Sequence, residues 1–67
     1  MEFSKKVAYV REKLSLSQEK LANKLGVSFS TVNRWEKSRA LPSFLAEEKF
    51  NHFCATHGID FTNVRDS

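Results

Sequence analysis

The sequence is poor in the features that mark secreted, membrane-spanning and disulfide-linked chains. Its 67 residues include one proline, two glycines and a single cysteine, Cys54, which excludes an intramolecular disulfide. No run approaches the roughly 20 apolar residues of a membrane helix, and the N-terminus lacks the apolar core of a signal peptide. We therefore expect a cytoplasmic protein in a reducing compartment, with no membrane partner.

Catalytic and metal-binding patterns are also missing. There is no Ser/His/Asp set in a recognisable context and no glycine-rich phosphate loop. A chain of this size buries only about 60% of its unfolded surface, so it has one core and little room for a pocket. Cys54 and His57 lie one helical turn apart, with His52 nearby, but a closed zinc site needs four ligands. We predict no enzymatic activity, no metal and no cofactor.

The charges are unevenly distributed along the chain. Residues 1–42 carry nine Lys or Arg against four Glu, a net of +5, whereas residues 43–67 carry two basic and four acidic side chains, a net of −2. Such asymmetry suits a surface that faces phosphates, because each neutralised phosphate releases counterions. An ordinary solvated basic surface accounts for the charge equally well.

The most informative segment is QEKLANKLGVSFSTVNRWEK, residues 18–37, in which a short turn joins two helix-sized parts. Gly26 follows the first part as a left-handed C-cap, and Ser28 precedes the second as an N-cap. Apolar residues recur at helical spacing in both parts: Leu21, Ala22 and Leu25 in the first, Val32 and Trp35 in the second. This pattern predicts a helix-turn-helix, and so DNA binding.

Several motifs of the chain resemble one family. They are LSLSQEKLANKLGVS (residues 14–28), Val32, the run RWE (34–36) and RALPS (39–43). On these residues the chain resembles the lambda-repressor-like (Cro/C1, XRE-type) helix-turn-helix domains of bacteria and phages, over roughly Phe3 to Ile59. Ser38 departs from the pattern, since the family most often has glycine there. The resemblance implies a small transcriptional regulator of bacterial or phage origin, in particular a repressor, that binds specific double-stranded DNA sequences.

The expected fold is all-α, a compact four-helix lambda-repressor-like domain with a short C-terminal extension. Helices are predicted over 3–14, after Ser17 to about residue 25, over 29–37, and from Pro42-Ser43 to about residue 57. The inward side chains of the last helix should be Leu45, Ala46, Phe50, Phe53 and Cys54. The domain is expected to span residues 1–59, with the motif at 18–37 and a tail at 60–67.

In the family the second helix of the motif enters the major groove and the first abuts the DNA backbone. The resemblance therefore gives four base-reading candidates: Phe29, Ser30, Asn33 and Arg34. Expected phosphate contacts are Gln18, Ser28, Thr31, Lys37, Ser38 and Arg39, with Arg11, Lys20 and Lys24 more peripheral.

Some of these side chains have a second interpretation. Arg34 can donate twice to guanine, or it can form a salt bridge with Glu36 or with a helix neighbour. Asn33 can bind adenine in a bidentate manner, a phosphate, or only water. Phe29 can pack on a thymine methyl group or fold back over the turn as a hydrophobic staple. Trp35 is expected in the core, because it lies three residues after Val32.

The six phenylalanines are many for so short a chain. Four of them, Phe44, Phe50, Phe53 and Phe61, lie in the acidic part; some should fill the core, and the surplus suggests a dimer surface. A homodimer on a palindromic operator is the expected partner state. Two other functions remain open: an autoregulator of the antitoxin or controller type, and a protein-interaction module that uses the phenylalanine-rich C-terminal half.

Overall fold

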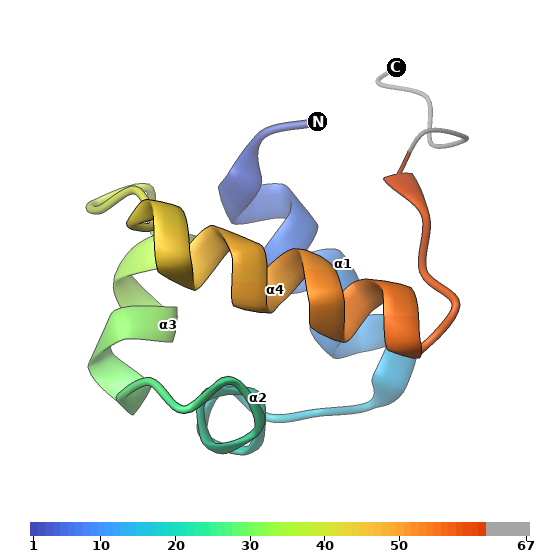
Figure 1. Cartoon of the computed structure of the whole chain (residues 1–67). Helices are drawn as coiled ribbons and strands as arrows, with labels where there is room; N and C mark the ends of the chain where they lie inside the picture. The colour runs from blue at the N-terminus through green and yellow to red at the C-terminus, as the bar shows by residue number, and fades with distance from the viewer. Residues whose placement is uncertain (62–67) are drawn as a thin grey trace.

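The computed structural model describes residues 1–61, and in this part of the chain it contains four α-helices and no strand. They are α1 (Phe3–Leu14), α2 (Gln18–Leu25), α3 (Phe29–Glu36) and α4 (Phe44–Thr56). Figure 1 shows α4 lying across α1, with α3 at one side and α2 viewed along its axis. The all-α, four-helix prediction is confirmed. Residues 62–67, which make up most of the predicted tail, lie outside the described residues.

The helix boundaries follow from local capping chemistry. Ser17, Ser28 and Ser43 each precede a helix, and their side-chain oxygens accept the N–H groups of Lys20, Thr31 and Ala46, respectively. Pro42 thus comes before the N-cap of α4, not inside its first turn. At the other end of α2, Gly26 adopts a left-handed φ of 71° as the C-cap, as its lack of Cβ allows.

One continuous core holds the four helices together. The first three helices contribute Val7 and Val10, then Leu21, Ala22 and Leu25, then Val32 and Trp35; α4 and the following turn contribute Phe50, Phe53, Cys54 and Ile59. The Trp35 ring, 3% exposed, lies 5.2 Å from the Phe3 ring, which confirms its core role.

One expectation about the C-terminal half was wrong. Leu45 is 64% exposed and does not face the core, because α4 turns Ala46 and Phe50 inward and leaves position 45 outside. The phenylalanines of this half divide between the core and the surface, as expected. Phe50 and Phe53 are buried and Phe61 packs against the core, so only Phe44 of this group is exposed. Docking of a partner through the C-terminal half stays a prediction, with Phe44 as its exposed phenylalanine.

The loop after α3 explains the departure at Ser38. This residue has a left-handed φ of 57°. Its N–H donates to the carbonyl of Trp35 at 3.1 Å, and the N–H of Arg39 donates to the carbonyl of Arg34 at 2.9 Å. These two hydrogen bonds are typical of a helix C-terminus that is followed by a residue with a left-handed φ. Glycine is favoured at that position. Ser38 thus adopts the left-handed conformation that glycine takes at this position in the family.

Replacing Ser38 with glycine is expected to stabilise the fold by about 0.5–1 kcal/mol, because the strain of a left-handed Cβ exceeds the added entropy of the unfolded chain. Thermal unfolding followed by circular dichroism should show a melting temperature raised by roughly 2–8 °C. Ser30→Gly is the matched control, since Ser30 lies inside α3 and the change should lower stability there. Equal effects of the two substitutions would contradict the strain argument.

Candidate nucleic-acid interface

The relative position of α2 and α3 is fixed by the turn between them. Only residues 26–28 connect the helices, and the N–H of Val27 donates to the carbonyl of Ala22 at 3.0 Å. Each helix then buries its own apolar side, with Leu21 on α2 and Val32 on α3 fully inaccessible to solvent. The side chains on the opposite side of α3 are therefore held outward on a rigid support.

The outer surface of α3 carries most of the residues predicted to read bases. Phe29, Ser30 and Arg34 are exposed, and Asn33 is half-buried. Phe29 is 52% exposed and takes no part in the apolar core, which argues against the staple over the turn. An exposed aromatic ring beside polar groups is suited to an apolar contact such as the methyl group of thymine.

A hydrogen bond between two amide side chains joins the helices across this surface. Nδ2 of Asn33 donates to Oε1 of Gln18 at 3.0 Å. The bond leaves the second Nδ2 hydrogen and Oδ1 of Asn33 available, together with the Nε2 group of Gln18. Gln18 is the first residue of α2, where the backbone N–H groups and the helix dipole also favour an anion. One bonded pair thus presents a donor for a phosphate and an amide edge for a base.

Three hydroxyl groups gather at the start of α3. Oγ of Ser28 lies 2.8 Å from Oγ1 of Thr31 and 3.1 Å from Oγ of Ser30, and it also accepts the N–H of Thr31. The cluster fixes the first turn of α3, because the Ser28 side chain satisfies a backbone donor that the helix leaves open. The phosphate contacts of Ser28 and Thr31 remain predictions.

The structure separates the two interpretations of Arg34. Its Nε is 3.4 Å from the carbonyl oxygen of Ser30, and no carboxylate of the described residues pairs with it. Glu36, the alternative partner, is bonded instead to Arg11, whose Nη2 donates to Oε1 at 2.8 Å and whose Nε donates to Oε2. The guanidinium of Arg34 therefore keeps its forked donors for an external acceptor.

The Arg11–Glu36 pair is the principal interaction that sequence reasoning missed. It ties α1 to the end of α3, and Arg11 also donates to the carbonyl of Leu16 at 3.1 Å. The two residues are 25 positions apart, so no helical spacing signals the pairing. Arg11 was expected to be a peripheral charge facing phosphate, but its guanidinium is committed inside the protein. Its role is to hold α3 in place.

Loss of either partner is expected to destabilise the fold by about 1–3 kcal/mol, because a partly buried charged group is left without its bonds. Urea unfolding of Arg11→Ala, Glu36→Ala and the double variant forms a double-mutant cycle, and the double variant should lose less than the sum of the single losses. Arg11→Lys tests the forked geometry, since it keeps only the charge. Purely additive losses would show that the two side chains do not interact.

The same pair is expected to be insensitive to pH near neutrality. The hydrogen bond to Glu36 is the main cause that raises the pKa of Arg11 above its ordinary value. When folding raises the pKa of a basic group, the group stabilises the fold at every pH below its ordinary pKa. That stabilisation is lost only as the pH rises through the raised pKa of the folded protein. Stability from the Arg11 charge should therefore stay constant between about pH 6 and 9.

The loop after α3 continues the polar surface. Lys37, Ser38 and Arg39 are all exposed and follow α3 directly, so they extend the row of predicted DNA contacts along the chain. Lys20 and Lys24 are exposed on α2. With Arg11 bonded to Glu36, the predicted phosphate-facing cations of residues 1–61 belong to α2 and to the loop that follows α3.

The residues considered for a metal do not come together. Cys54 is buried and burial raises the pKa of its thiol to about 11, whereas His57 is exposed and its Nδ1 lies 2.9 Å from the carbonyl oxygen of Phe53. No group of three or more His, Cys, Asp or Glu side chains suited to a metal was found in residues 1–61.

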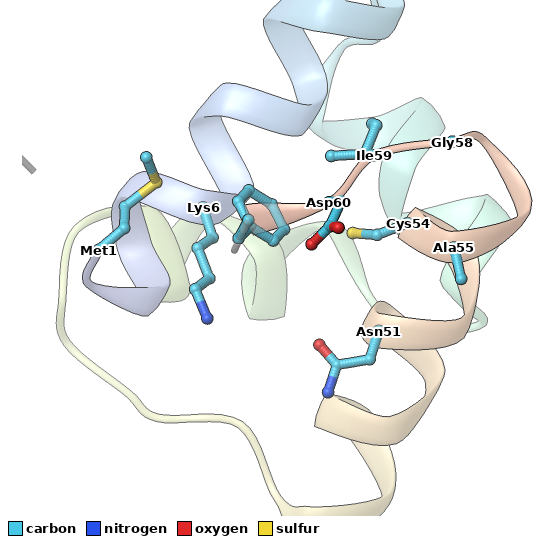
Figure 2. A pocket seen from close by; sticks show the side chains of 9 residues that line it. Met1, Lys6, Asn51, Cys54, Ala55, Gly58, Ile59 and Asp60 are labelled. Atoms are coloured by element: carbon cyan, nitrogen blue, oxygen red, sulfur yellow. The ribbon is translucent and has the colours of Figure 1, made fainter. Parts of the chain in front are cut away.

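An open pocket lies between the start of α1 and the end of α4. Figure 2 shows Met1 and Lys6 on one side and Asn51, Cys54 and Ala55 on the other. The Phe61 ring also lines the pocket, and its centre lies 5.3 Å from the Lys6 ammonium. No α3 residue lines this pocket, so it is separate from the candidate interface.

In a helix-turn-helix protein two short helices cross at a tight turn, and the second helix buries its apolar side and exposes its polar side. α2 and α3 have this arrangement. A family model for the helix-turn-helix domain matches residues 7–45, more than half of the chain. The chain therefore belongs to the helix-turn-helix family of the XRE/Cro/C1 type, a family of DNA-binding domains. No curated protein and no solved structure matched the chain. Among the described residues, every helix is too short or too polar to cross a membrane.

Proposed function

We propose that this protein binds specific sequences in duplex DNA by placing α3 in the major groove, and that it represses transcription by covering a promoter. The supporting observation is the outward set on α3: Phe29, Ser30 and Arg34 are exposed while Asn33 is held by Gln18. Val32 and Trp35 fix the same helix from the inside. A helix that is already held in place loses little freedom when it meets the bases, which favours specific recognition.

The contacts divide into reading and positioning. Arg34 donates in a fork to the two acceptors of guanine, and Asn33 uses its remaining donor and acceptor on adenine. Gln18 donates its free amide hydrogens to a phosphate at the start of α2. Because Asn33 and Gln18 share a hydrogen bond, the backbone contact fixes the register at which the base contact is made.

Affinity that does not depend on sequence comes from the loop after α3. Lys37 and Arg39 bring positive charge to the backbone on the far side of the groove, and Ser38 offers a hydroxyl nearby. Each neutralised phosphate should steepen the fall of affinity with salt by about 0.9 in a double-logarithmic plot. The protein is expected to act as a homodimer on two half-sites about 34 Å apart.

The test is selection of bound duplexes from a random-sequence pool at about 150 mM salt, where non-specific binding is already weakened. An enriched palindrome would establish sequence reading and give the spacing of the half-sites. A transcription assay with a promoter overlapping that palindrome then tests repression. A pool that stays random, with the protein shown to be folded by circular dichroism, would contradict the proposed function.

A further inference from the structure

A groove lies where α4 packs against the C-terminal end of α2, and Figure 1 shows α4 passing above α2. Its volume is about 420 Å³, which gives room for one large side chain and the groups beside it. No residue of α3 lines it, so it is separate from the candidate interface. We call it the cationic groove, and its lining includes Lys24, Leu25, Gly26, Lys49, His52 and Phe53.

Positive charge surrounds this groove without a matching negative charge. Lys24 and Lys49 come from different helices, both are exposed, and neither pairs with a carboxylate of residues 1–61. Lys20, one turn before Lys24, extends the positive charge along the same side of α2. Glu47 and Glu48, the acidic residues of α4, do not line the groove. The unpaired lysines make the site complementary to an acidic partner.

The position of Lys49 shows that its charge is not used inside the protein. Its Nζ lies over the turn between α2 and α3, 4.0 Å from the place where a Cβ would stand on Gly26. A lysine there can bond the last carbonyls of a helix. The N–H groups of Gly26 and Val27 already donate to the carbonyls of Asn23 and Ala22, and within the described part of the chain Lys49 bonds to none. The ammonium group therefore keeps its donors for an external acceptor.

The base of the cationic groove is apolar. Leu25 and Phe53 line it although they are only 5% and 8% exposed, so they lie deeper than the lysines around them. The side chain of Asn23 also lines the groove, is exposed and makes no hydrogen bond within residues 1–61. Its amide can donate to a peptide carbonyl. An apolar base inside a polar rim suits one apolar side chain of a bound peptide.

We infer that the cationic groove binds an acidic segment of a second protein, in which carboxylates flank one large apolar side chain. The carboxylates pair with Lys24 and Lys49, and the apolar side chain lies on Leu25 and Phe53. DNA fits this place less well, because a phosphate backbone offers no apolar group to cover the base of the groove.

The direction of α2 allows the segment to bind while the protein is on DNA. Gln18, the predicted phosphate contact, begins the helix, whereas Lys24 lies roughly 9 Å farther along its axis, at the end that meets α4. The groove is thus at the opposite end of α2 from the expected DNA backbone. Simultaneous binding rests on the proposed function, but binding of the acidic segment does not.

The first experiment titrates a capped peptide with two glutamates on each side of one phenylalanine into the isotope-labelled protein, followed by NMR. The backbone amide signals of Lys24, Gly26 and Phe53 should shift, and those of α3 should stay in place. The dissociation constant should be on the order of 0.1–1 mM, because exposed ion pairs each contribute little. A peptide with glutamines in place of the glutamates should bind far more weakly.

Charge-removing variants then locate the site. Lys24→Gln combined with Lys49→Gln should weaken peptide binding about 5- to 30-fold, the effect of losing two exposed ion pairs. Lys5→Gln combined with Lys13→Gln is the matched control, since it removes two exposed charges of α1, outside the groove, and should bind the peptide as the wild type does. Affinity of the groove variant for the selected duplex should be unchanged.

The possible results are distinguishable. Equal weakening in the two double variants would overturn the inference, because the peptide would then respond to net charge alone. Signal shifts centred on α3, or no binding by the folded wild type, would overturn it as well. A lower duplex affinity with a smaller salt slope in the groove variant would mean that the groove faces a phosphate backbone. Peptide binding at the groove by a protein that selects no duplex would overturn the proposed function and support this inference.

Discussion

Alanine at both Asn33 and Arg34 should lower affinity for the selected duplex about 100-fold or more, because each bidentate base contact contributes about 1–3 kcal/mol. The fold should survive, since Arg34 is exposed and the change removes only two side-chain hydrogen bonds, that of Asn33 to Gln18, worth about 1 kcal/mol, and the long one of Arg34 to the Ser30 carbonyl. Fluorescence anisotropy with labelled duplex measures the loss, and circular dichroism checks the folded state.

Two comparisons make this prediction specific. Lys49→Ala removes one exposed charge from α4, outside the expected DNA contacts, and should change affinity little. A random duplex should lose far less affinity than the selected one, with a nearly unchanged salt slope. If the double variant instead weakens every duplex equally and lowers the slope by about one, the contribution of the Arg34 charge, Arg34 and Asn33 contact phosphates and do not read bases.

Replacing Phe50 with alanine should cost about 3–5 kcal/mol, the second large effect expected in this protein. Phe50 is completely buried, and its ring lies 5.1 Å from Phe3 and 6.4 Å from Phe61. A chain of this length has a total stability of only about 3–10 kcal/mol, so most molecules should unfold near 37 °C or below. Thermal and urea unfolding measure the change, and DNA binding should disappear along with the folded state.

The matched control for this substitution is Phe44→Ala on the same helix. Phe44 is 79% exposed, so the same chemical change should alter stability by no more than about 0.5 kcal/mol. The contrast tests how α4 is oriented, since Phe44 and Phe50 differ in burial and not in type. Comparable losses at both positions would mean that α4 does not pack as described.

The sequence named the residues of the candidate interface, but it did not predict the hydrogen bonds among them. Spacing and resemblance together named Asn33, Arg34 and Gln18, because the positions of a helix-turn-helix are set by a short local segment. The hydrogen bond between Gln18 and Asn33 spans 15 residues, and no pattern along the chain signals it. The same holds for the ion pair that takes Glu36 away from Arg34.

By itself the sequence determined the local structure of this protein. The helix starts at Ser17, Ser28 and Ser43 and the turn at Gly26 were predicted because capping and left-handed φ depend on residues only a few positions apart. The tertiary structure decided which side of α4 meets the core. Leu45 and Ala46 both fit an apolar periodicity, but α4 can turn only one of them inward, and packing against the other helices selects Ala46. That selection leaves both Phe44 and Leu45 exposed to solvent.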